Sequence, residues 1–517
     1  MKILKLLSVG FFLVSFTISA QIKEKKLDKL IENTLEAFDV PGISVGIIKD
    51  GKTVYAKGFG KRSLATGKPM NKNTLVGIAS NSKGFTAFAL AMLVDDGKLN
   101  WDDKVREHLP EFRLKDAWVT ENFTVKDLLT HRSGLGLGGG DLMFFPEGNS
   151  YSAEDILDHL QYIEPTSSFR SKFEYNNNMF IVAGEVLERL SGMTWEEFIE
   201  ERILKPVGMT ATKASYNRVT DKSNIIDAHA RTEGEVIQIP HDWSETANPA
   251  GGLVSNITDM LTWAEFLMND AVTKDGERLL SEKQLHNLWQ MQMPLPVSKE
   301  NSYDTHFYGY GLGWFVKDVK GGFKEVTHTG GLLGTVTQFT LLPEKDLGIV
   351  VLTNQMSGSA FNTITNTIKD SYLDYENRDW LKKLKPKHDK WLAKNDSIKT
   401  AVYQQVKEMQ KKGIALQPEQ VIGTYKDNWF GEVTISKENG KLKIASEESE
   451  QLKGELLPYN TTTYVAKWNN RSFDADVFVL FNLDKNGKAQ SVTLEYIAPI
   501  TDFSFNFGDL RLERVEE

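Results

Sequence analysis

The chain contains no cysteine among its 517 residues. This absence excludes disulfide bonds, a thiol nucleophile, cysteine-ligated zinc and a lipidated N-terminal cysteine. The folded state must therefore rest on buried apolar surface, and the chain is long enough for two domains with separate cores. An excess of basic residues is also missing. The net charge of −9 argues against a general nucleic-acid-binding face, so no nucleic-acid partner is expected.

Several motifs that would indicate other enzyme classes are missing too. There is no G-x-S-x-G sequence, which argues against an α/β-hydrolase. There is no H-E-x-x-H sequence and no cluster of histidines, so no metal is expected. Residues 134–139 match the dinucleotide motif G-x-G-x-x-G by letters, but they follow an expected helix and open none. We interpret this segment as a mobile loop close to the functional site.

The first 20 residues have the features of a signal peptide. Lys2 and Lys5 precede an apolar stretch, 6–18, that is too short to span a bilayer comfortably, and small residues follow it. We expect residues 1–20 to be removed and the mature protein to be periplasmic or secreted, without an integral membrane span. An uncleaved membrane anchor is the alternative.

Residues 21–375 mix strand and helix patterns. One hairpin is expected over 43–59, and another joins 336–342 to 349–352. Helices are expected at 80–94, 124–129, 180–190 and 361–373. Strands at both ends with helices between them indicate an α+β domain whose sheet joins the first and last segments.

Two further regions follow. Residues 376–416 are basic, and Ile398, Val402, Val406 and Met409 recur at helical spacing. We favour a helical linker with one packed stripe over a basic surface for an acidic polymer or a membrane.

Residues 417–517 alternate apolar and polar side chains between short turns, which predicts a small all-β barrel or sandwich. We expect Trp429 and Trp468 to lie in its core rather than to line a sugar or lipid site.

Chemistry-bearing residues begin with Ser80-Asn-Ser-Lys83, at the start of an apolar helical stretch. A serine and a lysine three apart face the same side of a helix, close enough to share a proton. We expect Ser80 in the first turn, where the helix N-terminus favours a developing oxyanion. Each residue alone would more often be a helix cap or a surface charge.

Two other segments supply groups that such a site needs. Tyr175 and Asn177 precede a helix; a phenol beside an ammonium is expected to have a lowered pKa, and an amide can hold both the lysine and a substrate carbonyl. The sequence His328-Thr329-Gly330-Gly331 enters a strand. Glycines there allow close approach of a ligand and present backbone N–H groups to an oxyanion.

These three motifs, S-x-x-K, Y-x-N and H-T-G, occur in the order found in the serine β-lactamase-like superfamily, which this chain resembles. The resemblance is to the class C β-lactamase, penicillin-binding protein, D-aminopeptidase and esterase type, and runs from about residue 43 to about residue 354. Surrounding segments at 128–135, 249–255 and 310–314 resemble the superfamily as well. Residues 417–517 resemble a β domain of unknown function often fused behind such hydrolases.

The resemblance implies a β-lactamase/transpeptidase-like antiparallel sheet with a helical subdomain. It also implies an acyl-enzyme mechanism without a cofactor, in which Ser80 is the nucleophile and Lys83 assists its deprotonation. Tyr175 would serve as general base and then as acid, although sequence leaves open whether Lys83 or Tyr175 takes the first proton. Asn177, His328, Thr329 and Gly330 would contact substrate, and the N–H groups of Ser80 and Gly331 would form the oxyanion hole.

One position departs from the superfamily. Members that cleave β-lactams or D-Ala-D-Ala peptides usually have lysine where His328 stands, and an unperturbed histidine is mostly neutral at pH 7. We therefore expect an exported hydrolase of an amide or ester, with a D-residue peptide, a peptidoglycan-related compound or a small ester as substrate. A carboxylesterase and a penicillin-binding sensor without turnover are the alternatives. Arg132 is the alternative source of a cation, but we favour a structural turn for it. The oligomeric state stays open.

Overall fold

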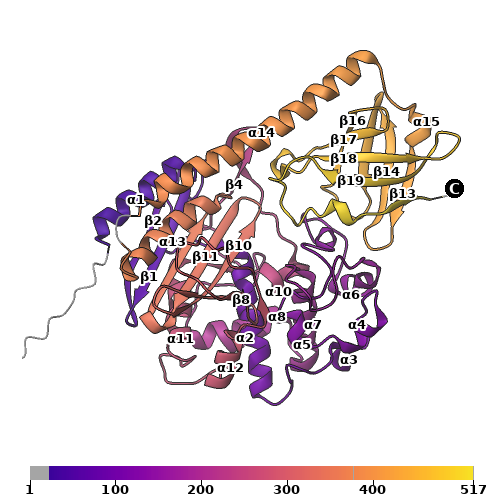
Figure 1. Cartoon of the computed structure of the whole chain (residues 1–517). Helices are drawn as coiled ribbons and strands as arrows, with labels where there is room; N and C mark the ends of the chain where they lie inside the picture. The colour runs from indigo at the N-terminus through magenta and orange to yellow at the C-terminus, as the bar shows by residue number, and fades with distance from the viewer. Residues whose placement is uncertain (1–21, 376–377, 516–517) are drawn as a thin grey trace, which may run out of the picture.

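The computed structural model describes residues 22–375 and 378–515, so the expected signal peptide lies outside the described part. An eight-stranded antiparallel sheet forms the centre of the first domain (Figure 1). Its order is β2 (Lys52–Gly60), β1 (Gly42–Lys49), β12 (Leu347–Thr353), β11 (Thr335–Leu342), β10 (Phe323–Leu332), β9 (Phe315–Val319), β8 (Tyr308–Tyr310) and β7 (Met293–Pro294). Because β1 pairs with β12, the first and last segments of the domain share one sheet, as predicted.

Helices cover both faces of this sheet because its central strands are apolar on both sides. On one face lie α1 (Glu24–Ala37) and α13 (Gly358–Tyr372), which share an apolar cluster with the strands. On the other face α11 (Ile257–Met268) packs closely against the strands. A Cβ on Gly46 would lie 2.7 Å from the Ile257 side chain of this helix, and a Cβ on Gly348 would lie 3.1 Å from the Cβ of Ala264.

A helical subdomain adjoins that second face. At its centre α2 (Ser82–Asp95) is buried along most of its length and packs against α7 (Asn178–Ser191). Shorter helices surround them: α3 (Val105–His108), α4 (Ala117–Asn122), α5 (Val125–Leu128), α6 (Ala153–His159), α8 (Trp195–Phe198), α9 (Lys205–Val207), α10 (Asn248–Gly251) and α12 (Glu282–Leu288). Two small ribbons complete it, β3 (Val76–Gly77) with β6 (Val254–Ser255) and β4 (Ala228–Thr232) with β5 (Glu235–Ile239).

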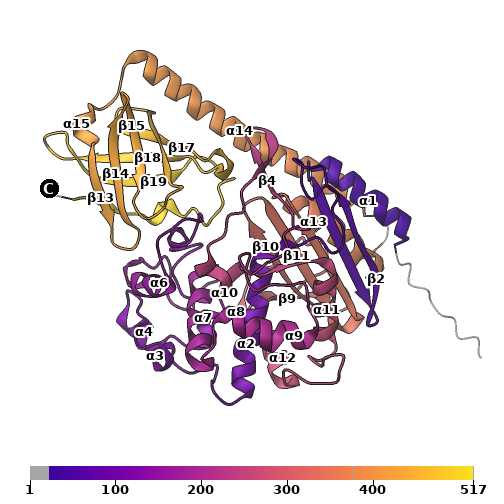
Figure 2. The same ribbon diagram turned by 180° about the vertical axis from the view of Figure 1, so that it is seen from behind.

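A 33-residue helix, α14 (Trp380–Lys412), connects the two domains and crosses the top of the molecule (Figures 1 and 2). Its C-terminal half carries the predicted apolar stripe. Val402 and Val406 are buried there against Val465 and Ile497 of the second domain. The basic side chains lie on the other faces of the helix, which agrees with a solvated linker surface.

The second domain is a closed antiparallel barrel, preceded by the short helix α15 (Pro418–Val421). Its strands are β13 (Gly423–Asp427), β14 (Gly431–Glu438), β15 (Lys441–Ser446), β16 (Lys453–Pro458), β17 (Thr463–Trp468), β18 (Val477–Leu483), β19 (Ala489–Tyr496) and β20 (Leu512–Arg514). The predicted all-β fold is confirmed, and of the two expected forms, barrel and sandwich, it is the barrel. Trp429 and Trp468 are both buried in the apolar core.

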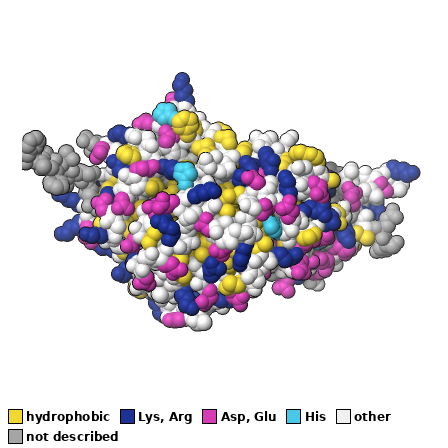
Figure 3. All heavy atoms as spheres, turned by 90° about the horizontal axis from the view of Figure 1, so that it is seen from below, with side chains coloured by type: hydrophobic (Ala, Val, Ile, Leu, Met, Phe, Trp, Pro, Cys, Tyr) yellow, Lys and Arg dark blue, Asp and Glu magenta, His cyan; other side chains and the backbone are white. Residues whose placement is uncertain are grey.

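On the face shown in Figure 3, basic and acidic side chains are interspersed rather than gathered into regions of one sign. Within residues 22–375 and 378–515, none of the helices is both long and apolar enough to cross a bilayer.

Gly84 of α2 makes a close contact with the Trp314 side chain, next to β9. A Cβ there would lie 2.3 Å from Cζ2 of Trp314, and that indole is almost completely buried. Gly84→Ala is therefore expected to lower the free energy of unfolding by about 1–3 kcal/mol, because a buried ring must be displaced. Chemical denaturation followed by tryptophan fluorescence measures the change.

Gly358→Ala provides a matched control on α13. The nearest atoms to its added Cβ lie 3.7 and 3.8 Å away on Phe361, which is ordinary contact. This variant should be as stable as the original or slightly more so. Equal stability of the two alanine variants would contradict the packing argument.

Candidate active site

Ser80 lies at the centre of the first domain, in a 3₁₀ turn formed by Ala79–Asn81 directly before α2. The expectation that Ser80 occupies the first α-helical turn is thus wrong, because α2 begins two residues later, at Ser82. The reason is local: Ala79 has a φ of 53°, a left-handed conformation that an α-helix cannot include. Asn81 donates to Thr337 Oγ1 of β11 at 2.8 Å, which fixes the turn against the sheet.

The amine of Lys83 is completely buried and donates three hydrogen bonds. It contacts Ser80 Oγ at 3.2 Å, Asn177 Oδ1 at 2.7 Å and the carbonyl oxygen of Ala250 at 2.7 Å. Among the described residues it makes no ion pair with a carboxylate. Burial lowers the pKa of Lys83 to about 7, and the charge of Asp141 acts in the opposite direction. The amine can therefore take up and release a proton near neutral pH.

Tyr175 reaches Ser80 from the segment before α7. Its phenol shares a hydrogen bond with the Ser80 hydroxyl, and Lys83 Nζ lies 4.9 Å from the centre of its ring. Burial, together with the negative charge of Asp141, raises the pKa of Tyr175 far above its ordinary value. The predicted lowering of this pKa was wrong, because burial disfavours the phenolate more than the nearby hydrogen bond stabilises it.

Asn177 occupies the N-cap position of α7 and links Lys83 to a carboxylate. While its Oδ1 accepts from Lys83, its Nδ2 donates to Asp141 Oδ2 at 2.8 Å. Asp141 is fully buried, and burial raises its pKa to about 7 despite the hydrogen bonds that it accepts. Sequence reasoning missed Asp141, because nothing around it in the chain marks it as part of a site.

The strand β10 forms the opposite wall. These residues lie in a strand, as predicted. Thr329 and Gly331 are exposed, whereas His328 and Gly330 are buried. At Gly330 a Cβ would lie 2.1 Å from the carbonyl oxygen of Ile78, which explains why only glycine fits beside the turn that carries Ser80. Nothing lies within 4 Å of the Cβ position of Gly331, so its backbone is open to the cleft.

His328 is a neutral side chain in this site. Its Nε2 lies 3.0 Å from Tyr310 Oη and its Nδ1 lies 2.6 Å from the carbonyl oxygen of Thr329. Burial and the charge of Lys83 lower the pKa of His328 to about 3. Since Nδ1 donates to Thr329, Nε2 is the acceptor for the Tyr310 hydroxyl. Position 328 therefore carries no positive charge at neutral pH.

Two residues of the segment 128–135 have structural roles. Arg132 donates to the buried carboxylate of Asp127 at 2.7 Å, as the turn interpretation predicts. His131 packs its ring 4.1 Å from that of Tyr175 and accepts from the backbone N–H of Asn176 at 3.1 Å. The sequence analysis singled out the segment 128–135 but indicated neither of the two contacts that His131 makes.

The structure thus brings Ser80, Lys83, Tyr175 and Asn177 into one hydrogen-bonded group, with Gly331 on the facing strand. Within the described residues no group of three or more His, Asp or Glu side chains is arranged to hold a metal ion.

The fold is that of serine hydrolases of the β-lactamase and penicillin-binding type. The family model described as Beta-lactamase matches residues 27–373, so the chain belongs to the Beta-lactamase family. This confirms the predicted resemblance. A second model, a domain of unknown function (DUF3471), matches residues 409–514 and covers the barrel.

Similar proteins support the same class. The chain is 28% identical over 356 residues to unguisins hydrolase ungD' of Aspergillus campestris, and 25% identical over 334 residues to protein flp of Staphylococcus aureus strain N315. Each alignment covers 64% of this chain, and the chain spans 62% and 63% of the length of these relatives.

Solved structures show a similar fold over both domains. The octameric penicillin-binding protein homologue from Pyrococcus abyssi superposes with a TM-score of 0.60 at 22% identity, over 94% of this chain and 99% of that one. The crystal structure of SurE gives a TM-score of 0.55 at 19% identity, over 95% and 98% of the two chains.

The hydrogen bond from Tyr310 to His328 gives a prediction for stability. Tyr310→Phe leaves a buried imidazole nitrogen without its donor, which should cost about 1–3 kcal/mol of unfolding free energy. Tyr308→Phe on the same strand is the control. The Tyr308 hydroxyl forms no hydrogen bond within the described chain, so this variant should lose under about 0.5 kcal/mol. Denaturant titration compares them, and equal losses would show that the Tyr310 bond contributes nothing.

Proposed function

We propose that the protein is an exported serine hydrolase that cleaves an amide or an ester through an acyl-enzyme on Ser80. The observation that carries this proposal is the group formed by Ser80, Lys83 and Tyr175, in which one hydroxyl contacts both an amine and a phenol. The features of residues 1–20 support export.

The pKa values favour one order of proton transfers. Neutral Lys83 accepts the Ser80 proton as Oγ attacks the substrate carbonyl carbon, and the carbonyl oxygen becomes an oxyanion. The N–H groups of Ser80 and Gly331 stabilise that oxyanion. Tyr175, protonated throughout the neutral range, donates its proton to the leaving amine or alcohol and recovers one from the Lys83 ammonium. Water then attacks the acyl carbon and loses a proton to Lys83. The bond from that carbon to Ser80 Oγ breaks, Oγ takes the proton back from the Lys83 ammonium, and the acid is released.

The substrate class follows from His328. A neutral, buried imidazole provides no cation on β10 for a substrate carboxylate, and Arg132 is occupied by Asp127. Thr329 is exposed on the same strand and offers a neutral hydrogen-bonding group. We therefore favour an uncharged acyl group beside the scissile bond, as in a D-residue peptide or a small ester, over an efficient β-lactamase.

Active-site labelling and a substrate screen test the proposal. The purified protein is treated with a fluorophosphonate and with labelled penicillin, and then assayed with p-nitrophenyl esters, D-amino-acid anilides and a chromogenic cephalosporin. Ser80→Ala should lose labelling and about a thousandfold or more of turnover, because the nucleophile is gone. Ser359→Ala, on α13 across the sheet, should keep both.

The outcomes separate the candidate functions. Turnover of esters alone indicates a carboxylesterase, and penicillin labelling without turnover indicates a sensor. Full activity of the Ser80→Ala protein would contradict the mechanism.

The pH dependence of kcat/KM gives a separate prediction. Because Lys83 must be neutral to accept a proton, and Asp141 titrates in the same range, kcat/KM should rise with pH through an apparent pKa near 7 that belongs to the pair. His131 and His328 face Lys83 but stay neutral in this range, since both have lowered pKa values. A profile flat from pH 6 to 8 would show that Lys83 is not the base.

A further inference from the structure

A loop of the barrel, residues 501–506, reaches the active site of the first domain. The Ser504 hydroxyl donates to Asp141 Oδ2 at 2.9 Å, although the two residues are 363 positions apart. Beside it, the ring of Phe503 lies 5.7 Å from that of Tyr175 in an edge-on arrangement. Ser504 and Asp141 are both buried. The second domain thus contacts Tyr175 directly and reaches Asn177 through Asp141.

The glycine-rich segment 134–140 is shaped to receive this loop. Gly138 has a φ of 68°, and a Cβ on it would lie 2.6 Å from the carbonyl oxygen of Phe503. Its N–H donates to the Tyr175 carbonyl oxygen at 2.8 Å, while Asn506 donates to the carbonyl oxygen of Leu137 at 3.3 Å. The segment interpreted from sequence as a mobile loop is therefore held between Tyr175 and the barrel.

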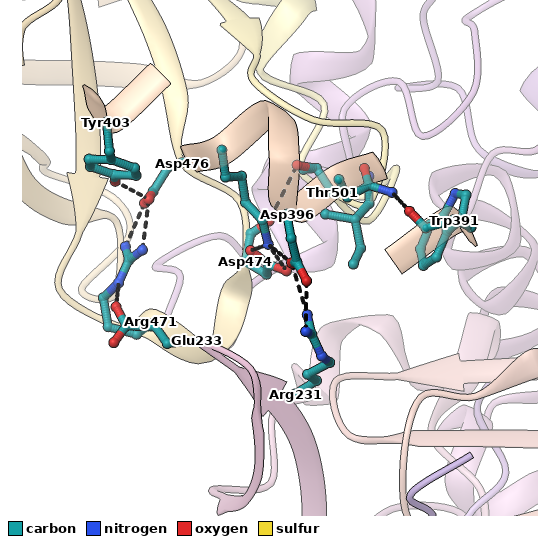
Figure 4. Close-up of polar contacts among 12 residues, drawn as sticks. Arg231, Glu233, Trp391, Asp396, Tyr403, Arg471, Asp474, Asp476 and Thr501 are labelled. Carbon is teal, nitrogen blue, oxygen red and sulfur yellow. Dashed lines mark hydrogen bonds and ion pairs between the residues drawn. The ribbon is translucent and has the colours of Figure 1, made fainter. Parts of the chain in front are cut away.

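The start of the barrel loop is anchored as well (Figure 4). Thr501 Oγ1 donates to the carbonyl oxygen of Asp474 at 3.4 Å, and the Asp474 carboxylate accepts from Lys399 of α14 at 2.8 and 2.9 Å. Arg231 of β4 forms a two-bond ion pair with Asp396 of α14, at 3.0 and 2.8 Å. These contacts join the first domain, α14 and the barrel around this loop. They therefore fix the position of Ser504.

Asp141 has an unusual set of partners. Its Oδ2 accepts both from Asn177 and from Ser504, whereas its buried Oδ1 has no partner within the described residues. Two donors on one oxygen stabilise the carboxylate form, because hydrogen bonds to a charged group favour that charge. The charged form in turn supports a proton on Lys83.

We propose that Ser504 is a positioning residue of the active site, supplied by the second domain. Acting through Asp141, it holds the Asn177 amide with Oδ1 toward Lys83 and maintains the negative charge that Lys83 faces. The proposal rests on the proposed roles of Ser80 and Lys83. It assigns the barrel a part in the reaction that the family model of the first domain does not contain.

The titration of Lys83 tests this chain of contacts without a substrate. In full-length protein with ¹³C-labelled lysine, the Lys83 signal is assigned by its loss in Lys83→Arg and followed with pH. Ser504→Ala should lower the Lys83 midpoint by roughly 0.5–1 pH unit, because a less stable Asp141 carboxylate supports the ammonium less. Asp502, Tyr175 and Tyr496 also face Asp141 and are unchanged in this variant.

Matched variants separate positioning from simple docking of the domains. Asp141→Asn should lower the midpoint at least as far, and adding Ser504→Ala to it should change nothing more, because the serine acts through the carboxylate. Ser504→Thr, which keeps the hydroxyl, should restore the original midpoint. Ser491→Ala, on β19, should leave it unmoved.

The rate of fluorophosphonate labelling of Ser80 is measured on the same proteins. At pH 9, where Lys83 is neutral in every protein, a roughly three- to thirtyfold slower reaction is expected for Ser504→Ala, since Asn177 and Lys83 are held less firmly. An unmoved Lys83 midpoint in Ser504→Ala would overturn the positioning role even if Ser80 reacts normally. A shifted midpoint in a protein whose Ser80 is never labelled would support the contact chain and overturn the proposed hydrolase.

Discussion

The active site depends on the burial of one amine. Lys83 is removed from water and surrounded by neutral oxygens of Ser80, Asn177 and Ala250, so its charged form is no longer strongly favoured. An exposed lysine would be almost fully protonated at neutral pH and could not accept the Ser80 proton. Burial of Lys83 among α2, α7 and α10 therefore allows it to act as a base toward Ser80 in the proposed mechanism. The same enclosure keeps Tyr175, His131 and His328 in their neutral forms.

Close approach of backbones achieves this enclosure, and glycines mark the contacts. Gly330 lets β10 lie against the turn before Ser80, and Gly84 lets the Trp314 ring lie against α2. Gly138 admits the barrel loop beside Tyr175. A side chain at any of these three positions would separate two of the segments that enclose the site. The geometry of the site thus depends on how several segments pack together. The three sequence motifs supply only its reactive groups.

Sequence predicted what depends on local pattern. The three-residue spacing of Ser80 and Lys83 places them together because the chain turns helically there, and the alternation at His328–Gly331 follows from a strand. The sheet that joins 43–59 to 349–352 was also predicted from its hairpins. The raised pKa of Tyr175 was not, because burial results from segments that are remote in sequence. Asp141 and Ser504 were missed for the same reason: their contact joins two domains, and neither stands in a recognisable motif.

The two sides of the site differ in charge. On the β10 side the position next to the cleft is a neutral histidine, held by Tyr310 and Thr329. On the opposite side lie the buried carboxyl group of Asp141 and the half-buried one of Asp502, and desolvation raises the pKa of each. Every hydrogen bond that stabilises the Asp141 carboxylate also favours the protonated form of Lys83. The neutral His328 on β10 adds no charge that would oppose this. Because one of those bonds comes from the barrel, the proton balance of the catalytic amine depends on how the second domain is seated. In the mechanism proposed above, a single carboxylate thus couples the docking of the barrel to the reactivity of Ser80.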